Sequence, residues 1–273
     1  MDKFRSRLLP FATEEAPAIT RNYRRLSLMV DKDYLKVPPA WESRAVLANV
    51  SRSSIEFNPT FVEPLEPSLW IELATEYDAE HFCEYLKSRV AAATLKLSSM
   101  FSDFERIWRR DELNHVHGFA RVYSVLYSVD DEDLLIRLRN RRPDFCAIEP
   151  FLADEFAVCV ALAFDEIATT RSYQYDMVHR YPKFGNQDLV DWIRLVARDE
   201  AWHFENALYI IRKNHARRIP DVPSFLARLV SYDSRREDYG ATFVLDHSAN
   251  DYTPEFLESC CAIIVRRLGL AVR

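Results

Sequence analysis

The sequence predicts an all-α fold built on a bundle of four long helices. From Ser68 to about Arg218, apolar residues recur at spacings of three and four, which is the period of a helix that buries one face. Glycine, a weak helix former, occurs only four times in 273 residues, and the few prolines of this stretch fall at expected helix ends. Both observations favour long, uninterrupted helices.

The chain divides into three parts on the same criteria. Residues 1–67 are predicted to hold an amphipathic helix, from about Glu14 to Met29, and then a proline-rich arm that packs on the core. Residues 68–218 would form the bundle. Residues 219–273 would add two helices to the same domain, near Pro223 to Tyr232 and Thr253 to Leu268.

The four bundle helices are placed by the apolar pattern and by capping signals. Ser102 and Glu105 form a candidate capping box, so the second helix is expected to start at Ser98 or Ser102. A short connecting helix is expected within the charged stretch from Asp130 to Pro143. The predicted bundle helices run from about Ser68 to Leu97, from Ser98 or Ser102 to Val129, from Pro150 to Arg180 and from Asn186 to His215.

Composition excludes several classes of function. The net charge of −6 and the pI near 5.7 argue against nucleic-acid binding, which needs a broad cationic surface. The glycines are too scattered for a phosphate-binding loop, and no apolar run is long enough to span a membrane. Five scattered cysteines, an odd number, indicate reduced thiols. We therefore expect a cytoplasmic protein that binds neither nucleic acid nor membrane.

Two copies of Arg-Asp-Glu-x-x-His lie 88 residues apart (200 − 112), at Arg110 to His115 and at Arg198 to His203. On the second helix, the Glu and the His fall within one ~80° arc with neighbouring aromatic residues, and the fourth helix behaves alike. Burying such charge is costly unless the groups are paired or bind a cation. The alternative for each pair is a surface contact between residues three apart. The two arginines fall off the inward stripe, which predicts surface roles for them.

A third carboxylate, Glu166, lies on the apolar stripe of the third helix, 34 residues before Glu200 (200 − 166), so that the two can meet. For the first helix, a hairpin turn at Ser98 and Ser99 would place Glu84 opposite Glu112, with Glu80 in reserve. His81 is either a further ligand or a hydrogen-bonded core histidine. The predicted metal ligands are Glu84, Glu112, His115, Glu166, Glu200 and His203.

Two glutamates from two helices and Glu-x-x-His from each of the other two are the ligand set of di-iron and di-manganese carboxylate bundles. Oxygen and imidazole ligands without thiolate suit two iron ions, with a manganese and iron pair as the alternative. Glu112 or Glu200 would bridge the ions, Glu84 and Glu166 would cap opposite sides, and each histidine would hold one metal.

The doubled Asp-Glu-x-x-His resembles the ferritin-like di-iron oxygenase superfamily, which includes bacterial multicomponent monooxygenases, ribonucleotide reductases and acyl-carrier-protein desaturases. Phe164 to Thr169 and Ala197 to His203 are similar to the third and fourth core helices of plant-type desaturases. The resemblance implies a ferritin-like bundle with added terminal helices. It also implies that Asp111 and Asp199 orient the histidine ligands, in keeping with the usual carboxylate partner of a ligating histidine.

The resemblance further implies an O2-dependent hydroxylase, desaturase or N-oxygenase. A small or carrier-bound metabolite and an external electron donor are expected, and so is a homodimer. Thr169 or Thr170 would lie beside the oxygen site, unless the threonine bonds back to its own helix. Tyr173 is a candidate redox-active residue. The aromatic residues expected either to line a substrate pocket or to form plain core are Phe104, Trp108, Phe119, Phe164 and Phe204.

Two other functions remain open at this point. A ferritin-like iron-binding protein or a rubrerythrin-like peroxidase would use the same ligands, although the sequence lacks a Cys-x-x-Cys rubredoxin module. A non-catalytic helical scaffold would bind no metal.

Overall fold

The computed structural model describes residues 34–233 and 252–271. The described residues from Lys36 onward belong to one compact unit. Every regular element within the described ranges is a helix and none is a strand, which confirms the predicted all-α class. The amphipathic helix expected between about Glu14 and Met29 lies outside the described residues, and the predicted divisions at residues 67 and 218 stay predictions.

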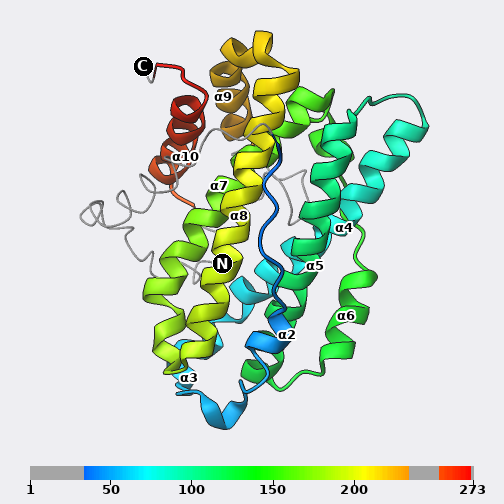
Figure 1. Cartoon of the computed structure of the whole chain (residues 1–273). Helices are drawn as coiled ribbons and strands as arrows, with labels where there is room; N and C mark the ends of the chain where they lie inside the picture. The colour runs from blue at the N-terminus through cyan, green and yellow to red at the C-terminus, as the bar shows by residue number, and fades with distance from the viewer. Residues whose placement is uncertain (1–33, 234–251, 272–273) are drawn as a thin grey trace, which may run out of the picture. The chain divides into compact units, whose positions relative to one another are not determined.

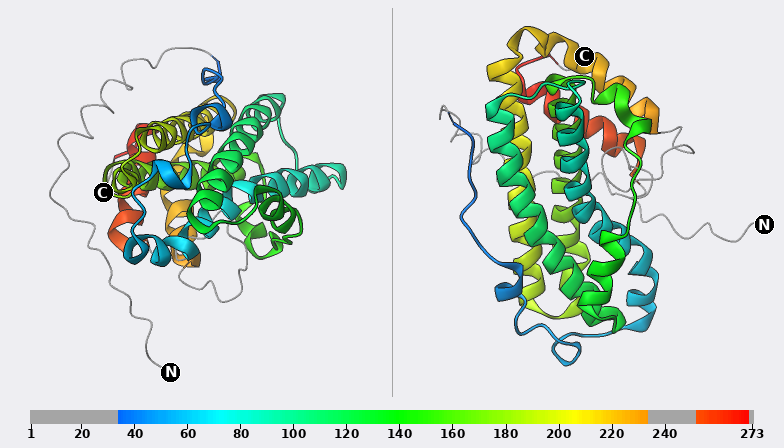
Figure 2. Two further views of the ribbon diagram at one scale, coloured as in Figure 1. Left: turned by 90° about the horizontal axis from the view of Figure 1, so that it is seen from below. Right: turned by 90° about the vertical axis from the view of Figure 1, so that its right-hand side faces the viewer.

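Four long helices form the bundle: α4 (Glu66–Ala91), α5 (Ser99–Tyr127), α7 (Glu155–His179) and α8 (Gln187–Asn214). Helices α4 and α5 make one hairpin and α7 and α8 make the other, as Figures 1 and 2 show. The two hairpins meet through direct packing of α5 against α8. The helices that carry the two Arg-Asp-Glu-x-x-His motifs are therefore neighbours.

Polar caps explain where three of these helices begin. The side chain of Ser98 accepts a hydrogen bond from the backbone N–H of Phe101, and Asp154 and Asn186 do the same for α7 and α8. Each cap satisfies backbone N–H groups that have no partner inside the helix. Ser102 lies inside the first turn of α5 and donates to the carbonyl of Ser98, so the capping box predicted at Ser102 is wrong.

Helix α4 ends at Ala91, six residues (97 − 91) before the predicted end at Leu97. Ala93 has a left-handed backbone with φ of 57°, and the N–H of Thr94 donates back to the carbonyl of Arg89 at 2.9 Å. A left-handed residue with such a bond closes a helix end. The turn between α4 and α5 therefore occupies residues 92–98 instead of Ser98 and Ser99.

Shorter helices cover the bundle. Helix α2 (Ser43–Val46) packs on α5 and α8, α6 (Asp131–Arg139) follows α5, and α9 (Val222–Asp233) and α10 (Pro254–Arg267) pack on α7. The remaining elements are α3 (Pro59–Val62) and 3-10 helices at Arg52–Ser54, Glu63–Leu65, Cys146–Phe151, Tyr181–Phe184 and Ala216–Asp221. Further helices thus follow α8, the last helix of the bundle.

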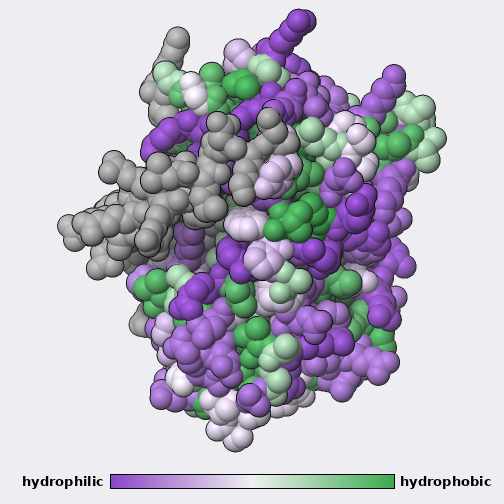
Figure 3. Space-filling view, in the orientation of Figure 1, coloured by the Kyte–Doolittle hydropathy of each residue, from purple (hydrophilic) through white to green (hydrophobic). Residues whose placement is uncertain are grey.

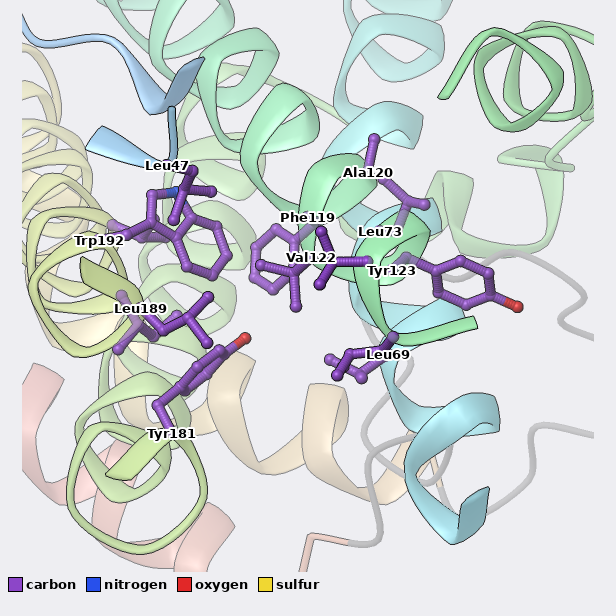
Figure 4. Packing of buried hydrophobic residues seen from close by; sticks show 14 of the residues in the cluster. Leu47, Leu69, Leu73, Phe119, Ala120, Val122, Tyr123, Tyr181, Leu189 and Trp192 are labelled. Carbon is purple, nitrogen blue, oxygen red and sulfur yellow. The ribbon is translucent and has the colours of Figure 1, made fainter. Parts of the chain in front are cut away.

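Close packing between α5 and α8 depends on one glycine. A Cβ atom at Gly118 would lie 2.2 Å from Nε1 of Trp192, a distance that no side chain could occupy. The same indole N–H donates to the hydroxyl of Ser43 at 3.1 Å, which ties α2 to the bundle. Figure 4 shows Trp192, Leu47 and Phe119 in this part of the core.

The face of the molecule drawn in Figure 3 is mostly hydrophilic and carries small, separate hydrophobic groups. No described helix combines the length and the continuous apolar character that a bilayer crossing requires.

Candidate metal centre

The two Glu-x-x-His pairs face each other in the middle of the bundle. Glu112 and His115 project from α5, and Glu200 and His203 project from α8. All four side chains are buried, and the two imidazole rings lie 6.3 Å apart between centroids. The two copies of the motif therefore form one site. The alternative of two separate surface pairs is wrong.

Two groups of side chains could each hold a metal ion, and within each group the potential ligand atoms all lie within 4.8 Å of one another. Both groups contain Glu112 and Glu200. The first is completed by Glu76 and His115, and the second by Glu166 and His203. The two shared carboxylates thus lie between two adjoining sites, each of which has its own glutamate and its own histidine.

The geometry repeats around the two histidines. Nδ1 of His115 lies 3.1 Å from Oε2 of Glu76 and 3.2 Å from Oε1 of Glu200. Nδ1 of His203 lies 3.0 Å from Oε2 of Glu200, 3.2 Å from Oε1 of Glu112 and 3.3 Å from Oε2 of Glu166. Each imidazole therefore points one nitrogen at the carboxylates of the cluster.

The outer nitrogen of each histidine faces an aspartate from the opposite motif. Nε2 of His203 lies 3.2 Å from Oδ2 of Asp111, and Nε2 of His115 lies 3.6 Å from Oδ2 of Asp199. The structure thus places both aspartates where the sequence predicts them, with the contacts crossing between α5 and α8. Such a contact fixes the orientation of an imidazole ring.

Two further residues hold Asp199. The indole N–H of Trp41 donates to its Oδ2 at 2.5 Å, and Arg198 donates to its Oδ1 at 2.9 Å. Arg110 donates to Oδ1 of Asp111 at 2.8 Å in the same manner. Both motif arginines lie off the inward face as predicted, with 48% of the Arg110 side chain and 32% of the Arg198 side chain exposed, and each also holds the aspartate that follows it.

Burial and mutual repulsion control the charge of the cluster. Burial, together with the charge of Glu112, raises the pKa of Glu76 to about 8. Burial and the charge of Glu200 likewise raise the pKa of Glu166 well above its usual value. Burial opposes protonation of His115, but the charge of Glu200 together with hydrogen bonds to Asp199 and Glu112 outweighs it and raises the histidine pKa. The pKa of His203 is also raised, with Glu166 as the main opposing charge to burial. In the absence of another cation, protons offset the crowded negative charge.

Two buried carboxylate oxygens of the cluster, Oε2 of Glu166 and Oε1 of Glu200, accept no well-aligned hydrogen bond, although they lie 3.3 and 3.2 Å from histidine nitrogens. Poorly satisfied buried oxygens are costly, and a divalent cation would satisfy them. Four carboxylates would also neutralise two divalent cations. The residues present fit a two-metal site in both chemistry and charge.

The ligand predicted from the first helix is corrected by the structure. Glu84 lies at the surface, where 60% of its side chain is exposed and Lys87 pairs with it at 3.1 Å. Glu80 pairs with Arg109, also near the surface. Glu76 takes the place in the cluster.

The early end of α4 explains why the prediction of Glu84 as a ligand is wrong. It moves the turn toward the N-terminus, so that the α4 residue opposite Glu112 lies about two helical turns earlier. The sequence predicts that His81 is either a further ligand or a hydrogen-bonded histidine. Its ring hydrogen-bonds Oδ1 of Asp78 at 3.1 Å, which agrees with the second alternative. The residues that share a helix face with each glutamate could not have identified Glu76 as the ligand, because Glu72 and Glu76 both lie on the buried face of α4.

The three predicted catalytic residues occupy different surroundings. The hydroxyl of Thr170 donates to the carbonyl of Glu166 at 2.7 Å, which is the helix-bonded alternative. Thr169 is partly exposed and lines a small cavity between α4 and α7. Tyr173 is buried and its hydroxyl donates to Glu76. Tyr173 is therefore in direct contact with the cluster.

The aromatic residues predicted around the site are all buried, and they pack on one another. Phe104 stacks on Trp108 with 6.3 Å between centroids, and Phe119 contacts both Trp192 at 4.8 Å and Tyr173 at 5.5 Å. Phe164 and Phe204 are buried as well. Phe119 thereby contacts the tyrosine that donates to Glu76, and a substrate space beside these rings stays a prediction.

No family model, no curated protein and no solved structure matches this chain. The all-helical bundle and its buried Glu and His cluster are compatible with a ferritin-like fold.

Proposed function

We propose that this protein is a di-iron, O2-dependent oxidoreductase of the ferritin-like superfamily. The observation that carries the proposal is the pair of adjoining ligand groups that share Glu112 and Glu200. Two carboxylates that belong to both ligand groups suit two cations held side by side. A structural ion pair would need only one of the two groups. The motif that suggested the superfamily contributes four of these ligands.

The donor set favours iron over softer metals. All donors are carboxylate oxygens or imidazole nitrogens, and such ligands suit iron and manganese, whereas thiolate selects zinc or copper. Glu76 and His115 would hold one ion, and Glu166 and His203 would hold the other. A manganese and iron pair is the alternative.

A pair of ferrous ions in this site would supply the electrons and the binding place for reduction of O2. The chain itself orients and shields the site. Asp111 and Asp199 face the outer nitrogens of the two histidines, and Tyr173 fixes one oxygen of Glu76 by donating to it. Burial of the cluster keeps bulk water away, which strengthens electrostatic interactions inside.

The reaction proposed is hydroxylation, desaturation or N-oxygenation of a small or carrier-bound metabolite, with an external electron donor and a homodimeric enzyme. This proposal rests on the resemblance of the doubled motif and on the ligand geometry.

Metal content tests the site. The purified protein loaded with Fe2+ should hold about two metals per chain, as the ligand count implies. Glu76→Ala, Glu112→Ala and His203→Ala should each lose metal, measured by elemental analysis. Glu84→Ala is the matched control, because its carboxylate lies on the same helix but at the surface. Loss of metal from the control and retention in Glu76→Ala would overturn the ligand assignment.

Oxygen uptake tests the reaction. Anaerobic protein loaded with Fe2+ should consume O2 when mixed with oxygenated buffer, and turnover should then depend on added reductant and substrate. Continued oxidation of many ferrous ions per chain without substrate would instead indicate iron storage. A protein that binds iron but consumes no O2 would exclude the enzyme.

A further inference from the structure

A small cavity lies between α4 and α7, on the side of the bundle away from the contact of α5 with α8. Its volume of about 20 Å³ is enough for roughly one water molecule or ion and far too small for an organic substrate. The cavity is partly open to solvent. Its lining residues are Glu72, Thr75, Asp165, Ala168, Thr169, Ser172, Tyr173 and Tyr252.

The lining is acidic and rich in hydroxyl groups. Glu72 and Asp165 contribute carboxylates that are largely buried, and Thr75, Thr169 and Ser172 contribute hydroxyls. Carboxylate and hydroxyl oxygens can replace the water shell of a divalent cation that enters a narrow space. An acidic wall also attracts cations and repels anions.

One carboxylate oxygen in the cavity wall has no partner. Arg180 and Ser68 both donate to Oε1 of Glu72, but Oε2 of Glu72 is buried and accepts no hydrogen bond. Only 7% of Glu72 is exposed. A buried carboxylate oxygen without a hydrogen bond costs free energy. Beside a cavity, such an oxygen is expected to bind a cation transiently.

One side chain, Tyr173, links the cavity to the metal cluster. Tyr173 lines the cavity, and its hydroxyl donates to Glu76. Glu72 and Glu76 are also four residues apart on α4 (76 − 72), which places them one turn apart on the same face. A cation at Glu72 is thus separated from the nearest cluster ligand by one helical turn and one tyrosine side chain.

We infer that the cavity between α4 and α7 is the port through which divalent cations enter the cluster, with Glu72 as a transient ligand. The inference rests on the proposed two-metal site. Arg180 does not block the port, because its guanidinium is held by Glu72 Oε1 and by Asp176 at 3.0 Å.

The rate of metal loading tests this port. Metal-free protein would be mixed with Co2+ in a stopped-flow instrument, because the visible absorption of Co2+ reports its ligands, and the final metal content would be measured by elemental analysis. Ser172→Leu fills the cavity and Glu72→Gln removes its charge. Each should slow loading by roughly 10-fold, the low end of electrostatic focusing effects, while the final metal content stays at the parental level.

Gln174→Leu is the matched control. It introduces the same side chain two residues farther along α7, about 200° around the helix, and it does not line the cavity. Glu72→Gln also weakens the ion pair with Arg180, so Ser172→Leu is the deciding variant. Thr169→Val keeps the volume of the wall and removes one hydroxyl. It should fold like the parent and load more slowly than the control.

The outcomes separate the port from the site itself. Unchanged loading rates in Ser172→Leu and Thr169→Val, with full final metal content, would overturn the port and leave the two-metal site standing. A reduced final content at an unchanged rate in Glu72→Gln would make Glu72 part of the resting site, which also overturns the port. Failure of the parent to bind Co2+ or Fe2+ would contradict the two-metal site before any variant is compared.

Discussion

Glu72 and Glu76 lie one turn apart on α4, yet they belong to buried clusters of opposite character. Glu72 faces Arg180, which also pairs with Asp176 at 3.0 Å. Glu76 lies with two further carboxylates and one histidine, namely Glu112, Glu200 and His115. The first cluster contains a fixed cation and the second contains none. The comparison shows that Arg180 supplies a permanent positive charge to the Glu72 cluster, although Oε2 of Glu72 still accepts no hydrogen bond, whereas the Glu76 cluster requires an ion from outside.

The protonation of the two clusters follows this difference. Nearby carboxylates outweigh burial and raise the pKa of Arg180, so its positive charge is permanent. In the metal cluster, the raised pKa values of both histidines mean that the only internal positive charge comes from protons. Protons can be displaced by a metal, whereas a guanidinium cannot.

The largest expected effect comes from removing the fixed cation. Arg180→Met should lower the free energy of unfolding by about 3–5 kcal/mol, because Glu72 and Asp176 would be left without their partner. Urea denaturation measures the change. The final metal content should be unaffected. A destabilisation below about 1 kcal/mol would mean that this ion pair behaves like an exposed one.

Metal removal should give the next largest effect. A chelator should lower the free energy of unfolding of the loaded protein by about 3–4 kcal/mol if free metal stands at 100 to 1,000 times its dissociation constant. Thermal denaturation with and without chelator measures it. The metal-free Glu112→Ala variant should show no response, which separates loss of metal from a general effect of the chelator.

A smaller effect is expected when a partner of a histidine is changed. Asp111→Asn should weaken metal affinity by about 10- to 100-fold, because a neutral amide holds the outer nitrogen of His203 less well. Competition with a coloured chelator gives the affinity. Asp103→Asn is the control, since Asp103 lies on the same helix in an exposed pair with Arg106. Equal affinities in the two variants would contradict the role of Asp111.

The most gradual expected effect is a dependence of stability on pH. Burial raises the pKa of Asp176 from 3.8 to about 7 in spite of Arg180. The folded state therefore binds a proton more tightly than the unfolded state, so stability is greatest below pH 4 and falls as the pH rises to about 7. The slope from this group is at most about 1.4 kcal/mol per pH unit. Asp176→Asn should flatten it in denaturation curves recorded from pH 4 to 7, and an unchanged slope would contradict the assignment.

Much of the site could be predicted from local sequence. Glu112, His115, Glu200 and His203 fall on apolar stripes because three- and four-residue spacings fix which side chains share a helix face. Glu166 was found by the same rule. The fold class follows from the same periodicity and from the scarcity of glycine. These inferences need only the geometry of a single helix.

The remaining part depends on how helices meet. The choice of Glu76 over Glu84 depends on the end of α4 at Ala91, which a left-handed residue sets at a position without glycine or proline. The crossed contacts of Asp111 and Asp199, and the bond from Trp41, join segments that are far apart in sequence. The sequence by itself determined which residues face inward, because periodicity is local. Only the tertiary structure decided which inward carboxylate from α4 meets the histidines, because register between helices depends on where each turn closes.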